Sequence, residues 1–425
     1  MADPRMVAKH PLLPLLRDAL LVAGVAVLTV QALRRFAGDR YVVPSDSMQP
    51  VLYGDPERGD VVFVGKLAWA TNRRRHDLVV VRHPEDPDKQ LVKRIAACGD
   101  DADACWIDIR DGDVWLGENA QRLQREVKDP LGARSMQATW AAWPSAAATL
   151  TAPLELAGAT VTGDAVLVLP PLRADDGSVQ DLFTAAARER RRTDRTAGVL
   201  PPGCIGTSRA VDASFVDVTN TRSRAGEDVG VHDCGMEIDL ERPVDVLLGS
   251  VDGRLQTLTF CWRASTGQIE LWSDGVVVER AALGHRPTGA HRVEFGLLDD
   301  RMYFVVDGRR DALVVFARRP EWQPGERAAP PRTHVHVAAV GSSALRCTRL
   351  RVFRDVYYHH ERIAGLPGDR GVGPQYVPGG SWYVLGDNTF DSRDSRHFGA
   401  VPMVSFLGVP MLVLGPWPRG RWLTP

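Results

Sequence analysis

Residues 301–308 read RMYFVVDG, an apolar run that ends in an Asp-Gly turn. Residues 268–275 read QIELWSDG, in which apolar and polar side chains alternate before the same turn. Alternation with a period of two is typical of half-buried β-strands, and Asp-Gly pairs are strong turn signals. Many short strands with regular turns predict an antiparallel β-sandwich. This alternating pattern with turn signals extends over residues 215–358.

Shorter strand signals lie on both sides of this segment. Residues 61–64 and 78–81 are β-branched runs bounded by turns, and the apolar residues 404–414 suit a buried strand. The sequence therefore predicts a mostly β chain in which a large insertion divides one β core. The expected parts are a membrane anchor at 12–36, a first core segment at 41–116, an inserted domain at 117–360 and a second core segment at 361–425.

Composition narrows the classes of function. The chain has 425 residues, 44% of them hydrophobic and 25% charged, which is ordinary for a globular protein of more than one domain. A net charge of -1 gives no basic excess, so we expect no nucleic-acid partner. The six cysteines fit no zinc pattern, and both single thiols and a local Cys98–Cys105 disulfide remain open. His334 and His336 alternate on one expected strand, but we assign no metal and no cofactor.

An apolar run near the N-terminus predicts a helix. Residues 19–33 read ALLVAGVAVLTVQAL. A helix of this run is about 22 Å long, which is shorter than the roughly 30 Å of a bilayer's hydrocarbon core. Leucines before the run extend it, with Arg17 and Asp18 as an interruption. No small-x-small cleavage site follows, which disfavours a removed signal peptide. We expect a single-pass membrane helix, with a buried core helix as the alternative.

Three short segments carry residues that can do chemistry. They are PSDSMQP at 44–50, LVKRI at 91–95 and GDNTFDSRDSR at 386–396. A serine hydroxyl is a weak nucleophile unless a base removes its proton, and no G-x-S-x-G elbow is present. A lysine can act as that base when burial disfavours its ammonium form. Lys93 follows an apolar strand-like stretch, which suits a desolvated amine.

Together and in this order, these segments resemble type I signal peptidase, the membrane-bound leader peptidase of bacteria. The resemblance implies that Ser47 is the nucleophile and Lys93 the general base. It implies that the Ser45 hydroxyl joins the Ser47 N–H in an oxyanion hole. It also implies that Ser392 orients the lysine. The positions that support the site by resemblance are Asp394, Arg396, Asp387 and Arg94.

The sequence departs from the family pattern after the base. The usual K-R-x-x-G-x-P-G-D continues here with Ala97 at the first glycine and without the proline. Residues 365–369 read GLPGD, which resembles the missing pattern without a lysine at the base position. Coincidence and an insertion that interrupts the motif are both open. Family members often carry an extra β-domain here, and the sandwich looks concanavalin- or laminin-G-like by fold analogy alone.

The resemblance implies a membrane-bound serine endopeptidase that removes signal peptides from secretory preproteins. Small residues before the cut would fit shallow apolar pockets, and the peptide would bind by strand addition. We expect a monomer in the cytoplasmic membrane, in contact with lipid, with its catalytic domain on the outer face. The alternative is a membrane-anchored glycan- or protein-binding module whose protease core has decayed. The complete set of matched residues disfavours decay.

Overall fold

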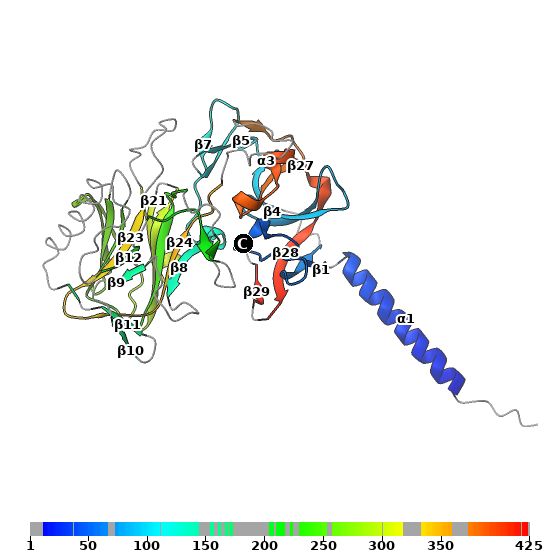
Figure 1. Cartoon of the computed structure of the whole chain (residues 1–425), viewed down its shortest axis with the longest axis horizontal. Coiled ribbons are helices and arrows are strands. Elements are labelled where there is room, and N and C mark those ends of the chain that lie inside the picture. Colours follow the sequence, from blue (N-terminus) through cyan, green and yellow to red (C-terminus); the bar gives the residue numbers. More distant parts are fainter. Residues whose placement is uncertain are drawn as a thin grey trace, which may run out of the picture.

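The computed structural model describes the two β regions and the N-terminal helix (Figure 1). The described residues are 12–36, 38–66, 73–110, 112–143, 154–156, 160–162, 166–169, 171–172, 204–207, 210–216, 222–223, 229–252, 257–299, 301–317, 333–358, 373–417 and 419–423. The GLPGD stretch at 365–369 lies outside them, so its relation to the base strand stays a prediction. The chain is mostly β, as the alternating pattern predicts.

The core sheet combines strands from both ends of the chain. It has eight strands in the order β1-β2-β28-β3-β4-β26-β27, and β29 pairs with β28. Their bounds are β1 Gly38–Val42, β2 Val61–Gly65, β3 Leu78–Arg82, β4 Gln90–Cys98, β26 Ser381–Leu385, β27 Val401–Pro402, β28 Phe406–Gly415 and β29 Arg421–Trp422. Strands β26 and β28 insert between or beside the early strands, so the core forms only when both segments are present.

A small sheet connects this core to the inserted domain. It has the order β25-β5-β6-β7, in which late strand β25 again pairs with an early one. The bounds are β5 Trp106–Arg110, β6 Asp113–Gly117, β7 Gln124–Arg125 and β25 Gln375–Tyr376. Strand β7 pairs with β6, so this small sheet includes residues on both sides of residue 117.

The inserted domain is a sandwich of two antiparallel sheets. One has the order β10-β11-β24-β15-β20-β21-β22, with β8 beside β24, and the other has the order β19-β18-β17-β16-β23-β12-β9. The first contains β8 Ala138–Trp143, β10 Thr160–Thr162, β11 Val166–Leu169, β15 Cys234–Leu240, β20 His291–Leu298, β21 Arg301–Val306, β22 Leu313–Ala317 and β24 Leu345–Arg354. The second contains β9 Leu154–Leu156, β12 Cys204–Thr207, β16 Val246–Asp252, β17 Thr257–Arg263, β18 Gln268–Ser273, β19 Val276–Ala282 and β23 His334–Val340.

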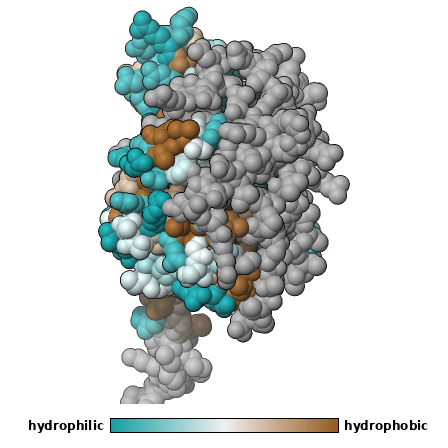
Figure 2. Space-filling view, turned by 90° about the vertical axis from the view of Figure 1, so that its left-hand side faces the viewer, coloured by the Kyte–Doolittle hydropathy of each residue, from teal (hydrophilic) through white to brown (hydrophobic). Residues whose placement is uncertain are grey.

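Aromatic side chains fill the space between the two sheets. Phe260 from β17 packs against Phe295 from β20 and Phe304 from β21, with ring centroids 4.8 and 4.7 Å apart. The sandwich predicted over 215–358 is present, and strands β8 to β12 join it from earlier in the chain. Strands β9 to β12 are only three or four residues long, so their alternation is weak in the sequence. Figure 2 shows much hydrophilic surface on the described part of the inserted domain, with separate hydrophobic patches.

The N-terminal apolar run forms helix α1, Leu12–Phe36, which extends away from the β regions (Figure 1). Among the described residues, no helix is long and apolar enough to cross a membrane. All six cysteines are described and are free thiols, so Cys98 and Cys105 form no disulfide.

Candidate active site

Ser47 lies in a tight turn between two core strands. The turn is a 3₁₀ helix, η1 Asp46–Met48, which follows β1 and precedes β2. Met48, the last residue of the turn, and Leu52, four residues later, are fully buried and fix the turn against the core. The Asn388 backbone N–H donates to the Ser47 carbonyl at 3.1 Å, and its side-chain amide donates to the Asp46 carbonyl at 3.1 Å. The GDN segment therefore holds the backbone that carries Ser47.

Lys93 lies on β4 with its side chain turned into the protein. Strand β4 pairs with β3 through Lys93, opposite Val79, and with β26 from Arg94 onward. The Lys93 side chain is only 2% exposed. Its Nζ atom lies 2.7 Å from Ser47 Oγ, which is hydrogen-bond distance. Two residues 46 positions apart in the sequence are thus in direct contact.

Burial lowers the pKa of the Lys93 amine to about 8, from an ordinary value of 10.5. Asp394 opposes this shift and Arg396 supports it. The cause is loss of water around the ammonium form, which a hydroxyl group replaces poorly. A substantial fraction of Lys93 is therefore neutral near pH 8, as a proton acceptor must be.

Asp394 organises the polar groups beside the lysine. It is fully buried, and it accepts hydrogen bonds from the Ser392 hydroxyl at 2.8 Å and from the Gly386 N–H at 2.9 Å. The Arg396 guanidinium donates to both of its oxygens at 2.9 Å. Burial by itself would raise the pKa of Asp394, but Arg396 outweighs it and the pKa is lowered. Asp394 is thus an anion whose charge Arg396 largely balances.

Ser392 and Gly386 pack directly against the Ser47 turn. A Cβ atom at Gly386 would collide with the Ser392 side chain and with the Ser47 carbonyl. The described hydrogen bond of the Ser392 hydroxyl is the one to Asp394. Its proposed influence on Lys93 therefore runs through Asp394 and through packing around Gly386.

A second buried ion pair lies one residue beyond the base. The Arg94 guanidinium donates to both Asp387 oxygens at 2.8 and 2.6 Å, and also to the His76 carbonyl at 2.7 Å. Bidentate pairs of this kind fix geometry as well as charge. This pair joins β4 to the residue that follows β26 and Gly386, so it fixes the base strand to the GDN segment.

A pocket of about 220 Å³ opens beside Ser47 and Lys93. Val43, Pro44 and Ser45 form one wall, and residues 90–93 of β4 form another. The Ser45 hydroxyl is exposed here and lies 3.4 Å from Ser47 Oγ. Along residues 90–93 the edge of β4 opposite β3 has no strand partner among the described residues.

The structure brings together all eight residues that the sequence singles out. The reasoning from sequence assigned no role to Asn388 or Gly386, although both lie in the quoted GDN segment. Asn388 clamps the nucleophile turn, and Gly386 leaves room for Ser392. Their positions in the sequence could have indicated these roles. Gly386 separates the strand that ends at Leu385 from the matched Asp387, and Asn388 directly follows Asp387.

These contacts define a class of site, in which a serine hydroxyl is held against a buried amine. Comparison with known families agrees with it. The family model described as "Signal peptidase, peptidase S26" matches residues 16–151 and 360–415. The unmatched stretch between them contains most of the sandwich. Over these two segments the chain is similar to the signal peptidase S26 family.

A curated relative supports the same family. The chain is 32% identical over 87 residues to Signal peptidase I of Aquifex aeolicus (strain VF5). This match covers 20% of the chain and 32% of the relative, so the chain spans about a third of the relative's length.

Solved structures with lectin-like folds also resemble the chain at low similarity. Galectin LEC-6 of Caenorhabditis elegans is 14% identical, covering 28% of this chain and 82% of its own, with a TM-score of 0.22. A Bacillus subtilis protein of unknown function with a galectin-like fold is 9% identical, covering 51% and 96%, with a TM-score of 0.28. Likeness at these scores carries no conclusion about what the inserted domain binds.

Proposed function

We propose that the protein is a membrane-bound serine endopeptidase that removes N-terminal signal peptides from secretory preproteins with Ser47 and Lys93. The observation that carries this proposal is the 2.7 Å approach of Lys93 Nζ to Ser47 Oγ in a buried setting. The match of both core segments to the signal peptidase family model supports the substrate class. The lowered pKa of Lys93 supports its role as a general base.

In the first half-reaction, Ser47 Oγ attacks the carbonyl carbon of the peptide bond to be cut. Neutral Lys93 takes the hydroxyl proton and then delivers it to the nitrogen of the leaving chain. The tetrahedral oxyanion would accept hydrogen bonds from the Ser45 hydroxyl and the Ser47 N–H, which are positioned where negative charge develops. The products are the released mature chain and an ester between the signal peptide and Ser47.

In the second half-reaction, Lys93 removes a proton from water, and the hydroxide attacks the ester. The proton returns to Ser47 Oγ as the signal peptide leaves with a new carboxyl group. Asp394 and Arg396 act as positioning residues because they touch neither reacting atom. They hold Ser392 and Gly386 against the turn that carries the nucleophile.

The pocket suits a peptide in extended form with small side chains before the cut. Leu91 and Val92 contribute apolar surface to it. The unpaired edge of residues 90–93 can add one further strand, whose backbone groups would satisfy those of β4. A volume of about 220 Å³ is too small for several large side chains at once.

We further propose that α1 attaches the catalytic domain to the cytoplasmic membrane, with the active site on the outer face. The helix exposes a run of large apolar side chains, Leu20, Leu21, Val25 and Leu28, each 60–67% exposed. Trp417 and Trp422 are exposed near the end of the core sheet, and tryptophan favours the membrane interface. Flotation with lipid vesicles tests this, because Leu21→Glu and Leu28→Glu together should release the protein from the lipid fraction.

The alternative, a binding module with a decayed protease core, predicts that Ser47 and Lys93 have no role in cleavage. The test is hydrolysis of a preprotein by purified protein in detergent. Ser47→Ala and Lys93→Ala should each abolish cleavage and leave the thermal unfolding midpoint near that of the unmodified protein. Lys89→Ala is the matched control, since Lys89 pairs with Asp86 on the surface and should cleave normally. Near-full activity in either active-site variant would refute the proposal.

A further inference from the structure

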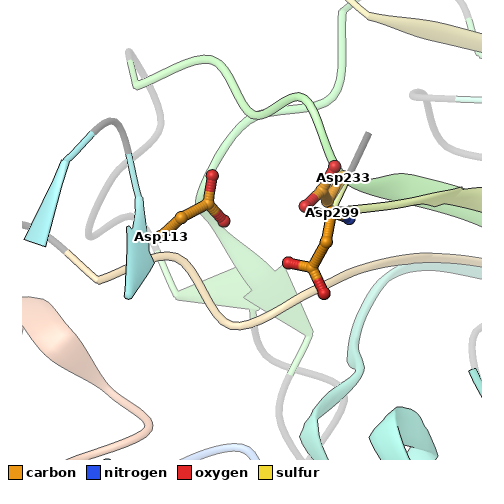
Figure 3. Close-up of side chains that lie close together, drawn as sticks. All are labelled: Asp113, Asp233 and Asp299. Carbon is orange, nitrogen blue, oxygen red and sulfur yellow. Dashed lines mark hydrogen bonds between the residues drawn. The ribbon is translucent and has the colours of Figure 1, made fainter. Parts of the chain in front are cut away.

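Four aspartates gather where the small core-side sheet meets the sandwich. Asp113 begins β6, Asp233 precedes β15, Asp299 follows β20 and Asp355 follows β24. Strands β24, β15 and β20 are neighbours in one antiparallel sheet. Asp233, Asp299 and Asp355 therefore lie at the same end of these strands. Figure 3 shows Asp113 reaching toward Asp233 and Asp299 from the other side. One carboxylate oxygen from each of these three lies within 4.8 Å of the others.

Two cationic side chains form ion pairs with these aspartates but do not fully neutralise their charge. Arg125 contacts Asp113 at 2.6 Å and Asp233 at 3.0 Å. Lys128 contacts Asp299 at 2.8 Å and Asp355 at 2.7 Å. Four carboxylates and two bases leave two negative charges within this group of six side chains.

A separate observation points to a missing partner. Asp355 is 5% exposed, and its Oδ1 atom is buried with no hydrogen-bond partner among the residues that the structure describes. Asp355 lines a small cavity of about 10 Å³ together with Asp113 and Asp233. This volume is close to the minimum that holds one water-sized species. A buried carboxylate oxygen without a partner costs about 1–3 kcal/mol or more, so a ligand that satisfies it is favoured.

We propose that this junction binds one divalent cation, of the Ca²⁺ class, through the carboxylates of Asp113, Asp233 and Asp299, with the free oxygen of Asp355 facing it directly or through water. Hard carboxylate oxygens without nitrogen or sulfur ligands suit Ca²⁺, whose coordination is flexible in number and angle. A charge of two also neutralises the group. The cation would fix the sandwich, through β15 and β20, to β6 of the core-side sheet.

Binding of ⁴⁵Ca²⁺ to the whole protein in detergent, by equilibrium dialysis after EDTA treatment, tests the proposal. We expect about one ion per chain at about 1 mM Ca²⁺, a concentration that weak extracellular sites bind. Saturation should raise the thermal unfolding midpoint by about 5 °C, because a ligand that binds only the folded state stabilises it. Absence of bound Ca²⁺ in the unmodified protein would overturn the proposal whatever the variants do.

Variants then locate the ion. Asp113→Asn should lower the affinity at least tenfold, and Asp355→Asn should lower it by a smaller factor. Asp355→Asn keeps the Lys128–Asp299 pair, so it provides a folded variant if Asp113→Asn unfolds. Asp103→Asn removes an exposed carboxylate from the same half of the chain and should bind normally. Undiminished binding in both Asp113→Asn and Asp355→Asn would place the ion elsewhere and overturn the proposal.

Discussion

The active site and the domain junction each contain a buried lysine, and the two lysines have opposite electrostatic surroundings. Lys93 contacts a neutral serine hydroxyl, and burial lowers its pKa to about 8. Lys128 is also buried, and burial alone would lower its pKa. Direct contacts with Asp355 and Asp299 outweigh this and hold the pKa well above the ordinary value. Burial therefore lowers the pKa of a lysine enough for it to act as a base only where no carboxylate is in direct contact with the amine.

The two lysines also differ in how they interact with the nearest carboxylates. Asp394 influences Lys93, but its two oxygens accept hydrogen bonds from Arg396, Ser392 and the Gly386 N–H. Arg396 therefore keeps the nearest carboxylate from acting on the lysine as Asp299 acts on Lys128. In the junction the lysine is the counter-ion, and its removal leaves two buried carboxylates without it.

Replacement of the base should have the largest effect on activity. In Lys93→Met the side chain keeps similar bulk but cannot accept a proton, so we expect kcat/KM to fall about 10⁴-fold or more. Stability should stay near that of the unmodified protein, because the lost partner is a hydroxyl. Preprotein cleavage and urea unfolding measure both quantities. A loss of stability that accounts for the lost activity would contradict the contrast with Lys128.

Replacement of the second lysine should have the reverse effect. Lys128→Met leaves Asp299 and Asp355 without their shared cation, and breaking one side of a buried ion pair costs about 3–5 kcal/mol. We expect that loss in the free energy of unfolding measured with urea in EDTA. Under conditions where the variant is folded, kcat should be unchanged. Lys89→Met, at an exposed ion pair, should change stability by less than about 1 kcal/mol.

The pH dependence of cleavage should report the lowered pKa of Lys93. Below pH 8 the amine is mostly protonated and cannot accept the Ser47 proton, so kcat/KM should fall about tenfold for each pH unit. Between pH 8 and pH 6 the expected loss is about 50-fold, and above pH 8 the profile should level off. A preprotein without titratable groups near the cut isolates this effect. A flat profile from pH 6 to pH 10 would contradict a lysine base.

Loosening the nucleophile turn should have the smallest effect. Asn388→Ala removes the amide that donates to the Asp46 carbonyl, a bond worth about 1 kcal/mol. We expect kcat to fall about tenfold or less, with little change in KM. Gln121→Ala removes an amide from the exposed surface and should leave both constants unchanged. Equal kinetics for the two variants would show that Asn388 does not hold the turn.

Local sequence predicted the parts of this protein whose signals lie close together. The β-branched runs gave β2 and β3, and the Asp-Gly turns gave the hairpins of the sandwich. Ser47 and Lys93 were each unremarkable alone. The order of the three motifs predicted that they meet, and the structure has them 2.7 Å apart.

Features that depend on distant residues could not be predicted in this way. The four aspartates of the junction come from four separate strand ends and share no motif, so nothing marked them among 53 acidic residues. Strands β9 to β12 have only three or four residues each, which is too few to show alternation. The N-terminal helix was predicted over residues 12–36, and helix α1 has these bounds.

Pairing of β4 with β26 has a consequence for synthesis of the chain. Arg94 and Asp387 are 293 positions apart, so a ribosome must complete the whole sandwich before β26 exists. Contacts over such distances form late in folding. Until then Lys93 is hydrated, with an ordinary pKa near 10.4, and its amine stays protonated at neutral pH. Under the proposed mechanism the unfinished chain therefore cannot cleave a peptide bond, and activity arises only once the last strands have folded.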